Sequence, residues 1–326
     1  MTFWKDKKVL VTGGCGFIGS RLVERLVEAG SKVGVVDDLK RGKWENLAAV
    51  RDQIEVVEAD LLDAGNCRKA CEGRDMVMHL AAKIRGVGYN VKHHAEMFYS
   101  NALMNINMME AGRLENVDRF LCISTVGIYP VDCGVPTSEV DGFKGEPEMS
   151  GFGYGWSKRM AEVQARCYHM EYGTKVAIVR PYHVYGPRDD FNLETAPVVP
   201  SQIRKILDAK DKVIVWGDGE QTRSFTYVDD EVDGMMLAVE KSPNAEAFNI
   251  AAEEEIKIKD LVAMIIRLSG KNLEVEYDLS KPTGSPRRCA DISKARSMLG
   301  YEPKVSLEEG IKRTMDWYRK KMEKES

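Results

Sequence analysis

Four residues before position 160 form a set that could move a proton to or from a hydroxyl group. Tyr154 and Lys158 are four positions apart, so on a helix both side chains project from one face. A tyrosine is a weak base at its usual pKa of about 10, but a neighbouring ammonium group favours the phenolate. Ser124 and Thr125 add two hydroxyl groups at the end of an apolar run. Alone, the Tyr and Lys also suit an ordinary solvated helix, so the surrounding elements decide.

A glycine-rich segment near the start of the chain predicts a dinucleotide site. Gly13, Gly16 and Gly19 stand between the apolar run Val9–Val11 and a stretch of helical spacing that ends at Gly30. Glycines at such positions allow a tight turn, close approach of the backbone to a pyrophosphate, and close packing of helix on sheet. The first turn of the helix then offers free N–H groups to the phosphates.

Acidic residues follow the next two predicted strands. Asp37-Asp38 lies eighteen residues beyond Gly19, where a carboxylate can bond a ribose diol and would repel a 2′-phosphate. We therefore expect NAD as the cofactor, although Lys40-Arg41 is a counter-indication. Asp60-Leu61 after the third strand would flank the adenine, but Asp60 also suits an ordinary loop start.

The order of elements predicts an α/β fold, a Rossmann-type doubly wound parallel sheet with a smaller C-terminal α/β substrate-binding lobe. Short apolar runs alternate with stretches of helical spacing, as in βαβ units covered on both faces. We assign residues 1–181 to the NAD-binding domain and 182–326 to the second lobe, whose segments can interleave with the first. A charged amphipathic tail predicts a surface helix over Leu307–Lys324. The predicted strands are Val9–Val11, Val33–Val36, Ile54–Val57, Met76–Leu80, Phe120–Ile123 and Val176–Val179.

Composition excludes several classes of protein. The 326 residues carry 44% hydrophobic and 30% charged residues with a net charge of −4, an ordinary globular balance that disfavours nucleic-acid binding. No apolar run approaches the roughly 20 residues of a membrane helix, and the N-terminus lacks a signal-peptide core, so we expect a cytoplasmic protein. The seven cysteines are scattered, and Cys67 and Cys71 have no second pair to complete a metal site. No metal is expected.

Together these motifs resemble the extended short-chain dehydrogenase/reductase superfamily, in particular its nucleotide-sugar epimerase and dehydratase branch. The resemblance covers nearly the whole chain. Its glycine spacing is G-x-x-G-x-x-G rather than G-x-G-x-x-G. The matching segments are Thr12–Gly19, Asp60-Leu61, His79–Ala82, Asn101, Ser124-Thr125, Tyr154 with Lys158, Arg180-Pro181, Tyr185–Pro187, and Gly217–Gly219 leading to Arg223.

The resemblance assigns roles to the proton-transfer set and to the cofactor loop. It implies that Lys158 also holds the nicotinamide ribose, that Thr125 shares the proton of a sugar hydroxyl with Tyr154, and that Ser124 supports it. The residues expected to contact NAD are Gly13, Gly16, Phe17, Ile18, Gly19, Asp37, Asp38, Asp60, Leu61, Ala81, Ala82, Tyr154 and Lys158.

A nucleotide-diphosphate sugar is the substrate class that the resemblance implies. An arginine placed like Arg223 binds the diphosphate in the family, and Arg287 in the cluster Arg287-Arg288 is the expected second phosphate contact, since arginine can grip phosphate oxygens bidentately. Arg85 and Asn192 are further expected substrate contacts. His183 replaces a family asparagine, and its ring could donate to the substrate, pack in the core, or act as an acid and base.

Local details narrow the reaction. Sugar 4,6-dehydratases carry an acidic pair directly after the threonine, where this chain has Val126 and Gly127. GDP-mannose 3,5-epimerase and GDP-fucose synthase resemble the chain in texture but place a cysteine at the position of Gly127. We therefore expect hydride-mediated 4-epimerisation of a UDP- or GDP-hexose. The alternatives are a GDP-sugar 3,5-epimerase, a 4-keto-sugar reductase, or a non-catalytic NAD-binding regulator.

The resemblance also implies an assembly. The predicted helices Asn101–Gly112 and Tyr154–Tyr172 often form a dimeric four-helix bundle in this superfamily, so we expect a homodimer.

Overall fold

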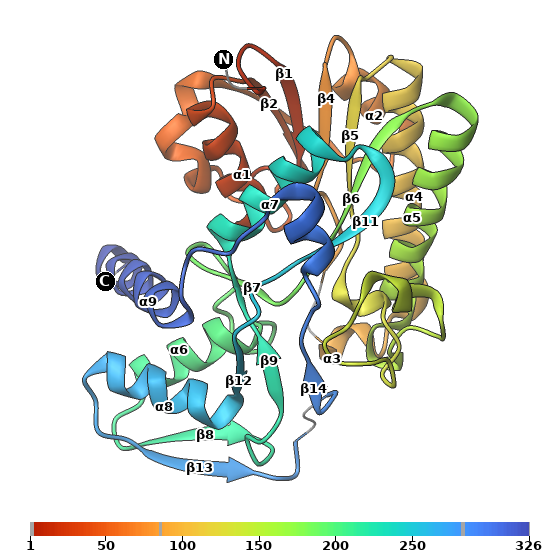
Figure 1. Ribbon diagram of the computed structural model, residues 1–326. Coiled ribbons are helices and arrows are strands. Elements are labelled where there is room, and N and C mark those ends of the chain that lie inside the picture. The colour runs from red at the N-terminus through yellow and green to blue at the C-terminus, as the bar shows by residue number, and fades with distance from the viewer. Residues whose placement is uncertain (1–2, 85–86, 282–283, 326) are drawn as a thin grey trace.

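The computed structural model describes residues 3–84, 87–281 and 284–325 (Figure 1). Arg85, an expected substrate contact, lies outside the described residues. Within them, seven parallel strands form one sheet in the order β11-β6-β5-β4-β1-β2-β3. The strands are β1 (Lys8–Thr12), β2 (Lys32–Asp37), β3 (Ile54–Glu58), β4 (Met76–His79), β5 (Arg119–Ile123), β6 (Lys175–Pro181) and β11 (Asn244–Ile250).

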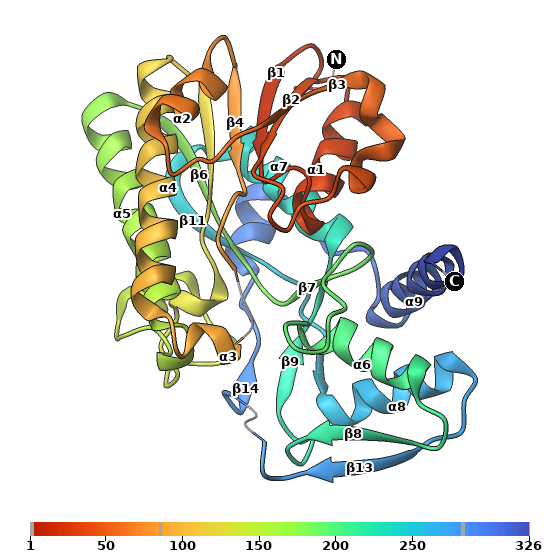
Figure 2. The ribbon, with the colours of Figure 1, turned by 180° about the vertical axis from the view of Figure 1, so that it is seen from behind.

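Helices cover both faces of this sheet, which explains its bare apolar strands (Figures 1 and 2). Val9 and Val11 of β1 belong to one core, together with residues of α1 and α7, whereas Leu10 belongs to the other core with residues of α2, α4 and α5. Figure 2 shows α4 and α5 side by side along one edge of the molecule. The covering helices are α1 (Phe17–Glu28), α2 (Ala64–Cys71), α4 (His94–Leu114), α5 (Phe152–Tyr172) and α7 (Val228–Lys241).

A smaller lobe lies beyond the carboxyl ends of the strands (Figure 1). It contains β8 paired with β13, β9 between β12 and β14, and the short pair β7 and β10. Its strands are β7 (Val184–Tyr185), β8 (Lys212–Trp216), β9 (Thr222–Ser224), β10 (Thr226–Tyr227), β12 (Glu255–Lys257), β13 (Glu274–Asp278) and β14 (Arg287–Arg288). Its helices are α6 (Val198–Asp208), α8 (Ile258–Ser269) and α9 (Leu307–Glu325).

Six short helices or helical turns connect the larger elements of the described chain, and two of them, η1 and η2, contribute residues to the pocket described below. They are α3 (Val87–Asn90), the 3₁₀ helices η1 (Trp44–Gln53), η2 (Val126–Ile128), η3 (Glu139–Phe143) and η4 (Met149–Gly151), and the π-helical turn η5 (Ala295–Leu299).

The predicted α/β architecture and its six strands are confirmed. Strand β11 was not predicted from the sequence. Its first residues include the polar Asn244 and Glu246, and it is an edge strand that, among the described strands, pairs with β6 alone. Because β11 and α7 come after residue 181 but pack with the large sheet, the chain crosses between the lobes more than once. The motif segment Gly217–Gly219 connects β8 to β9, and these two strands belong to separate sheets.

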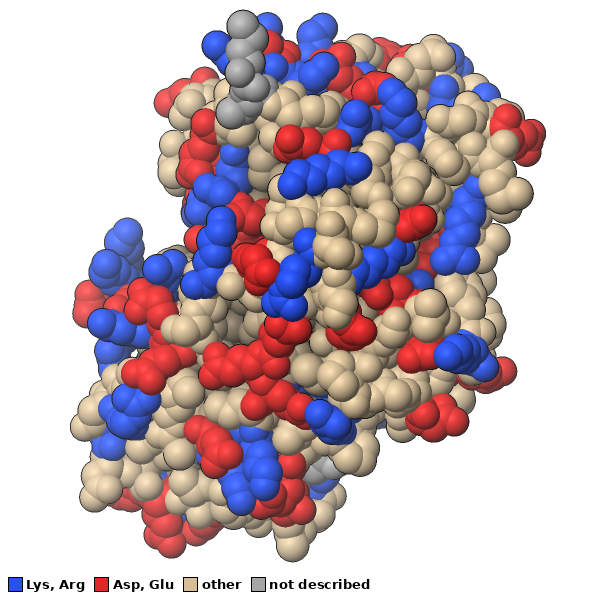
Figure 3. Space-filling model, in the orientation of Figure 1, with Lys and Arg blue, Asp and Glu red and all other residues tan. Residues whose placement is uncertain are grey.

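Basic and acidic side chains are interspersed over the face of the molecule shown in Figure 3. Across the described residues, no helix has the length and apolar content that a membrane crossing requires. The predicted C-terminal helix is present as α9, which projects beside the smaller lobe (Figure 1). The described residues contain no group of three or more His, Cys, Asp or Glu side chains arranged to hold a metal ion.

Candidate active site

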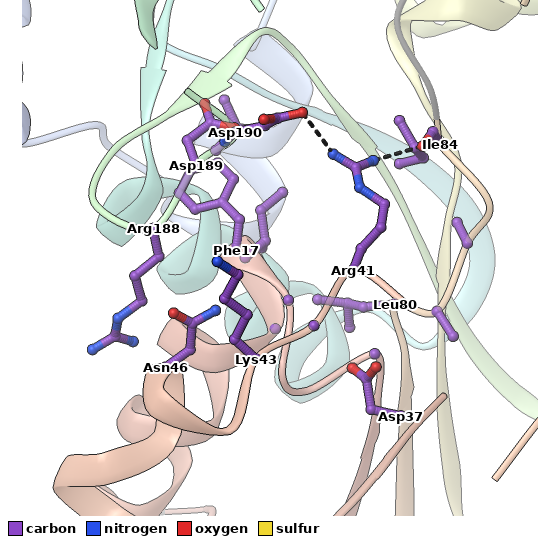
Figure 4. A pocket seen from close by; sticks show the side chains of 18 of the residues that line it. Phe17, Asp37, Arg41, Lys43, Asn46, Leu80, Ile84, Arg188, Asp189 and Asp190 are labelled. Carbon is purple, nitrogen blue, oxygen red and sulfur yellow. Dashed lines mark hydrogen bonds and ion pairs between the residues drawn. The ribbon is translucent and has the colours of Figure 1, made fainter. Parts of the chain in front are cut away.

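A pocket of about 2250 Å³ lies at the carboxyl ends of β1, β2, β4 and β5 and extends toward the smaller lobe. This edge is where open parallel sheets bind ligands. Figure 4 shows part of it, with side chains from the loops after β2, β4 and β7 facing one another. The expected cofactor residues Phe17, Ile18, Leu61, Ala81 and Ala82 all line this pocket.

The glycine loop has the shape that a pyrophosphate requires. Gly16 is the N-cap residue of α1. Because glycine has no side chain, it makes no capping hydrogen bond to the first N–H groups of the helix. A Cβ at Gly19 would lie 2.1 Å from the Gly13 carbonyl oxygen, so only glycine permits this packing of turn on helix. Gly13, Gly16 and Gly19 all line the pocket. This loop and helix end therefore fit a dinucleotide.

Asp37 closes β2 at the pocket, where the sequence places the ribose contact. Its buried carboxylate accepts hydrogen bonds from the backbone N–H groups of Cys15 (3.0 Å) and Leu39 (2.9 Å). Burial raises the pKa of Asp37, and these two hydrogen bonds oppose the rise. The carboxylate is thus held between the glycine loop and the loop after β2.

The neighbouring acids form a more exposed pair around Lys40. Lys40 Nζ lies 2.9 Å from an Asp38 oxygen and 3.0 Å from an Asp60 oxygen. A hydrogen bond from the Leu62 backbone N–H and the ion pair with Lys40 lower the pKa of Asp60. The Lys40 charge that counted against NAD is therefore matched by two carboxylates.

The proton-transfer set comes together at the end of β5. Ser124, Thr125, Tyr154 and Lys158 all line the pocket, and Lys158 Nζ lies 5.7 Å from the centre of the Tyr154 ring. Thr125 Oγ1 accepts a hydrogen bond from the Gly127 N–H at 3.1 Å, which leaves its own hydroxyl hydrogen available to a ligand. The buried Ser124 Oγ has no hydrogen-bond partner among the described residues.

The packing of α5 against η2 brings Tyr154 to Thr125. A Cβ at Gly155 would lie 2.8 Å from the Gly127 carbonyl oxygen and 2.6 Å from Pro147 Cβ. Only glycine allows this approach, so the residue beside Tyr154 fixes how closely the helix meets the strand end.

Burial controls both ionisable groups of the set. It raises the pKa of the Tyr154 phenol above its ordinary value and lowers the pKa of Lys158 from 10.5 to about 8. The expected fall in the pKa of Tyr154 is therefore not a property of the protein residues alone. A bound cation beside the ring, in addition to Lys158, would favour the phenolate.

His183 also lines the pocket, with a defined orientation of its ring. Its Nδ1 lies 3.2 Å from the Ser224 carbonyl oxygen. Because a carbonyl oxygen only accepts, Nδ1 carries the proton. Burial and the positive charge of Arg223 lower the pKa of His183 to about 3, so the ring is neutral near pH 7 and Nε2 is an acceptor. Titration near neutral pH, one of the three expected roles, is not supported.

The arginine cluster differs from the sequence-based expectation. None of Arg223, Arg287 and Arg288 is among the described residues that line the pocket. The Arg287 guanidinium is half exposed and donates two 2.7 Å hydrogen bonds to Glu255. Arg288 instead pairs with Arg223 in the register of β14 and β9. Arg288 is buried, donates to Glu148 at 3.0 Å, and has Nη1 without a partner among the described residues. Arg287 and Arg288 point to opposite faces because they are neighbours in the two-residue strand β14. This strand was not predicted from the sequence.

The two arginines create an electropositive spot next to His183. The pKa of Arg223 is lowered by burial and by the charge of Arg288, so the two guanidinium groups repel each other. Glu148 offsets only part of this charge. An anion at this place would relieve the repulsion.

Asn192 lies at the rim of the pocket. Its side-chain oxygen accepts the Glu194 N–H at 3.1 Å and so stabilises its own turn. Asn192 is exposed, which leaves its amide NH₂ accessible to a ligand.

The chain is similar in sequence to proteins of one enzyme family over nearly its whole length. Residues 9–251 match the family described as "NAD dependent epimerase/dehydratase family". The chain belongs to this family. It is 32% identical over 320 residues to a dTDP-4-dehydro-6-deoxy-D-allose reductase of a Streptomyces species (97% of each chain). It is 30% identical over 330 residues to GDP-mannose 3,5-epimerase of Arabidopsis thaliana (99% of this chain, 85% of the relative).

The fold comparison agrees. The crystal structure of UDP-glucose 4-epimerase from Thermotoga maritima, solved with UDP-glucose, has a TM-score of 0.88 and 34% identity, over 97% of this chain and 99% of that one. The protein is therefore an enzyme of the epimerase/dehydratase family, within the extended short-chain dehydrogenases/reductases, and its cofactor is NAD.

Family membership does not fix the reaction, because these relatives catalyse different ones. The side chains that line the pocket narrow the choice of reaction further. No cysteine is among the described residues that line it, and Val126 is the lining residue directly after Thr125. The carboxylates that line it come from residues 37–60 and from Asp189-Asp190, not from the segment after Thr125.

Proposed function

We propose that the enzyme epimerises a UDP- or GDP-hexose at C4 through a keto-sugar intermediate. The observation that carries this proposal is the proton-transfer set of Tyr154, Lys158 and Thr125 at the end of β5, without a thiol or second acid among the described lining residues beside Thr125. A 4-epimerase needs one proton acceptor and one hydride carrier. Dehydration or 3,5-epimerisation requires additional acids and bases.

The residues of the set divide the work. Tyr154 Oη takes the proton from O4 of the sugar, and Lys158 with its ammonium charge stabilises the phenolate. Thr125 donates its hydroxyl hydrogen to the same sugar oxygen and so orients it. Bound NAD supplies the acceptor, and later the donor, of the C4 hydride. The keto sugar then rotates in the pocket and presents its other face, and Tyr154 returns the proton to O4.

Arg223 and Arg288 would hold the diphosphate. Their mutual repulsion and the unpartnered Arg288 Nη1 favour an anion with several oxygens between them. His183, with a neutral ring and Nε2 as acceptor, would bond a hydroxyl of the ligand rather than a phosphate oxygen. Arg288 replaces Arg287 in this assignment.

A panel of UDP- and GDP-hexoses incubated with the purified enzyme tests the proposal. We expect the C4 epimer of one substrate by NMR, no change in NAD(H), and loss of turnover in Tyr154→Phe. Tyr168→Phe, another tyrosine of α5 that does not line the pocket, is the matched control. Net NAD(H) turnover would instead establish a reductase, deuterium uptake from D₂O at C3 or C5 a 3,5-epimerase, and full biological activity of Tyr154→Phe a non-catalytic regulator.

We further propose that a second copy of the chain covers the outer face of α4 and α5. This face exposes Tyr99 (62%) and Met170 (82%), with Ile106 and Val163 also exposed. Such a cluster of apolar side chains on two adjacent long helices suits a four-helix interface. Met170→Glu with Val163→Glu should convert the dimer to a monomer in light scattering, whereas Val140→Glu, on an exposed side chain of η3, should not. A monomeric wild type, or an unchanged dimer in the double variant, would contradict this.

A further inference from the structure

Arg41 connects three segments across the mouth of the pocket. From the loop after β2, its Nη1 donates to the Ile84 carbonyl oxygen in the loop after β4, at 2.6 Å. Its Nη2 donates to Asp190 Oδ2 in the loop after β7, at 3.2 Å. Figure 4 shows the Arg41 side chain extended between these two partners. We call the three residues the Arg41 bridge.

The acceptor on the far side of the bridge is held in place. Asp190 Oδ2 also accepts from Thr195 Oγ1 at 2.7 Å, and Asp190 Oδ1 accepts from the Asn192 N–H at 2.9 Å. The Asp190 side chain is only 22% exposed. A carboxylate fixed by its own loop loses little side-chain freedom when Arg41 binds it, so this ion pair is more favourable than one between two mobile side chains.

The bridge lies on the route of the dinucleotide. Arg41, Ile84 and Asp190 line the same pocket as the glycine loop at one end and Tyr154 at the other. A cofactor that reaches from Asp37 to Tyr154 therefore occupies the space that the three connected loops border.

The direction of the Arg41 side chain also bears on cofactor choice. An arginine after β2 can bind a 2′-phosphate and so favour NADP. Here the guanidinium donates to Ile84 and Asp190, and Asp190 compensates its charge. The contacts of this guanidinium in the structure are therefore with protein groups of two other loops.

We propose that the Arg41 bridge retains NAD in the pocket, and that it must open before the cofactor can dissociate. Retention suits an enzyme that restores its cofactor in each cycle, but the inference depends only on NAD binding and not on the sugar or on the carbon that reacts.

The test measures release of NADH from the wild type and from bridge variants. Enzyme loaded with NADH is mixed with excess NAD, and the loss of bound-NADH fluorescence gives the dissociation rate. We expect Arg41→Ala to release NADH about tenfold faster, with smaller increases for Asp190→Asn and Arg41→Lys, which keep part of the contact. Because an exposed ion pair is screened by salt, raising the ionic strength should speed release in the wild type more than in Arg41→Ala.

Arg68→Ala is the matched control, since Arg68 forms an exposed ion pair with Glu115 and does not line the pocket. Arg68→Ala should release NADH at the wild-type rate. A release rate of Arg41→Ala within twofold of the wild type would overturn the proposal. So would a selective loss of NADP affinity in Arg41→Ala with NADH release unchanged, which would make Arg41 a phosphate contact. The test does not depend on the proposed reaction, because NADH release is measured without a sugar substrate.

Discussion

The ion pair between Arg180 and Glu162 should make a large contribution to stability that depends on both partners. Arg180 is 1% exposed and Glu162 is fully buried. Arg180 Nε and Nη2 donate to the two Glu162 oxygens at 2.8 and 2.7 Å, and Nη1 donates to Tyr129 Oη and the Glu139 carbonyl oxygen, both at 2.8 Å. The pair joins β6 to α5, one helical turn after Lys158.

Glu162→Gln leaves the buried Arg180 cation without its counter-charge. Breaking a buried pair in this way costs about 3–5 kcal/mol. At about 2 °C per kcal/mol for a chain of this size, the melting temperature should fall by roughly 6–10 °C. The double change Glu162→Leu with Arg180→Met removes both charges and should recover at least half of that loss, because an apolar pair of similar volume replaces the buried ions.

Thermal unfolding followed by near-ultraviolet circular dichroism measures these effects. Glu302→Gln is the control, since Glu302 pairs with Arg296 on the surface, where solvent screens an ion pair and its contribution to stability is small. A melting temperature for Glu162→Gln no lower than that of Glu302→Gln would show that the buried ion pair contributes no more than a surface pair. A double variant as unstable as the single one would show that packing, not the buried charge, causes the loss.

Three further predictions concern the site and one buried acid. Tyr154→Phe should lower kcat by about 10²–10⁴, and kcat of the wild type should fall as the pH rises through about 8, where Lys158 loses its proton. Arg288→Gln should raise KM about tenfold, and Arg287→Gln less than twofold, in steady-state kinetics. Burial raises the pKa of Glu231, whose two oxygens have no partner among the described residues. The native state thus keeps this proton, and its stabilising effect is lost as the pH rises above the unfolded pKa. In urea unfolding, the stability of Glu231→Gln relative to the wild type should therefore increase as the pH rises above the unfolded pKa of the carboxyl group; a constant difference would contradict this.

The sequence predicted those parts of the fold that local pattern determines. Bare apolar runs such as Val9–Val11 specify strands covered on both faces, and helical spacing specifies the helices between them. The edge strand β11 escaped because its first half is polar and its place depends on pairing with β6, far away in the chain. Long-range pairing of this kind leaves no local signal.

The site shows the same division. The glycine loop, Ser124-Thr125, and Tyr154 with Lys158 were predicted from spacing, and the structure brings them to one pocket. The choice between Arg287 and Arg288 depends on the register of β14 with β9, which spacing does not determine. The same is true of the Nδ1 proton of His183, because the acceptor on Ser224 lies 41 residues away. The run Arg180-Pro181 was noted as a motif, but its buried partner Glu162 was not.

In the proposed reaction, hydride leaves C4 and returns to C4 of the same sugar, while Tyr154 transfers only the O4 proton. The most direct measurement follows a nucleotide hexose labelled with deuterium at C4 through turnover in ordinary water, by NMR and mass spectrometry of both epimers. We expect full retention of deuterium at C4 in the product, with none in solvent or in free NADH. Loss of the label to solvent, or its appearance in released NADH, would contradict it.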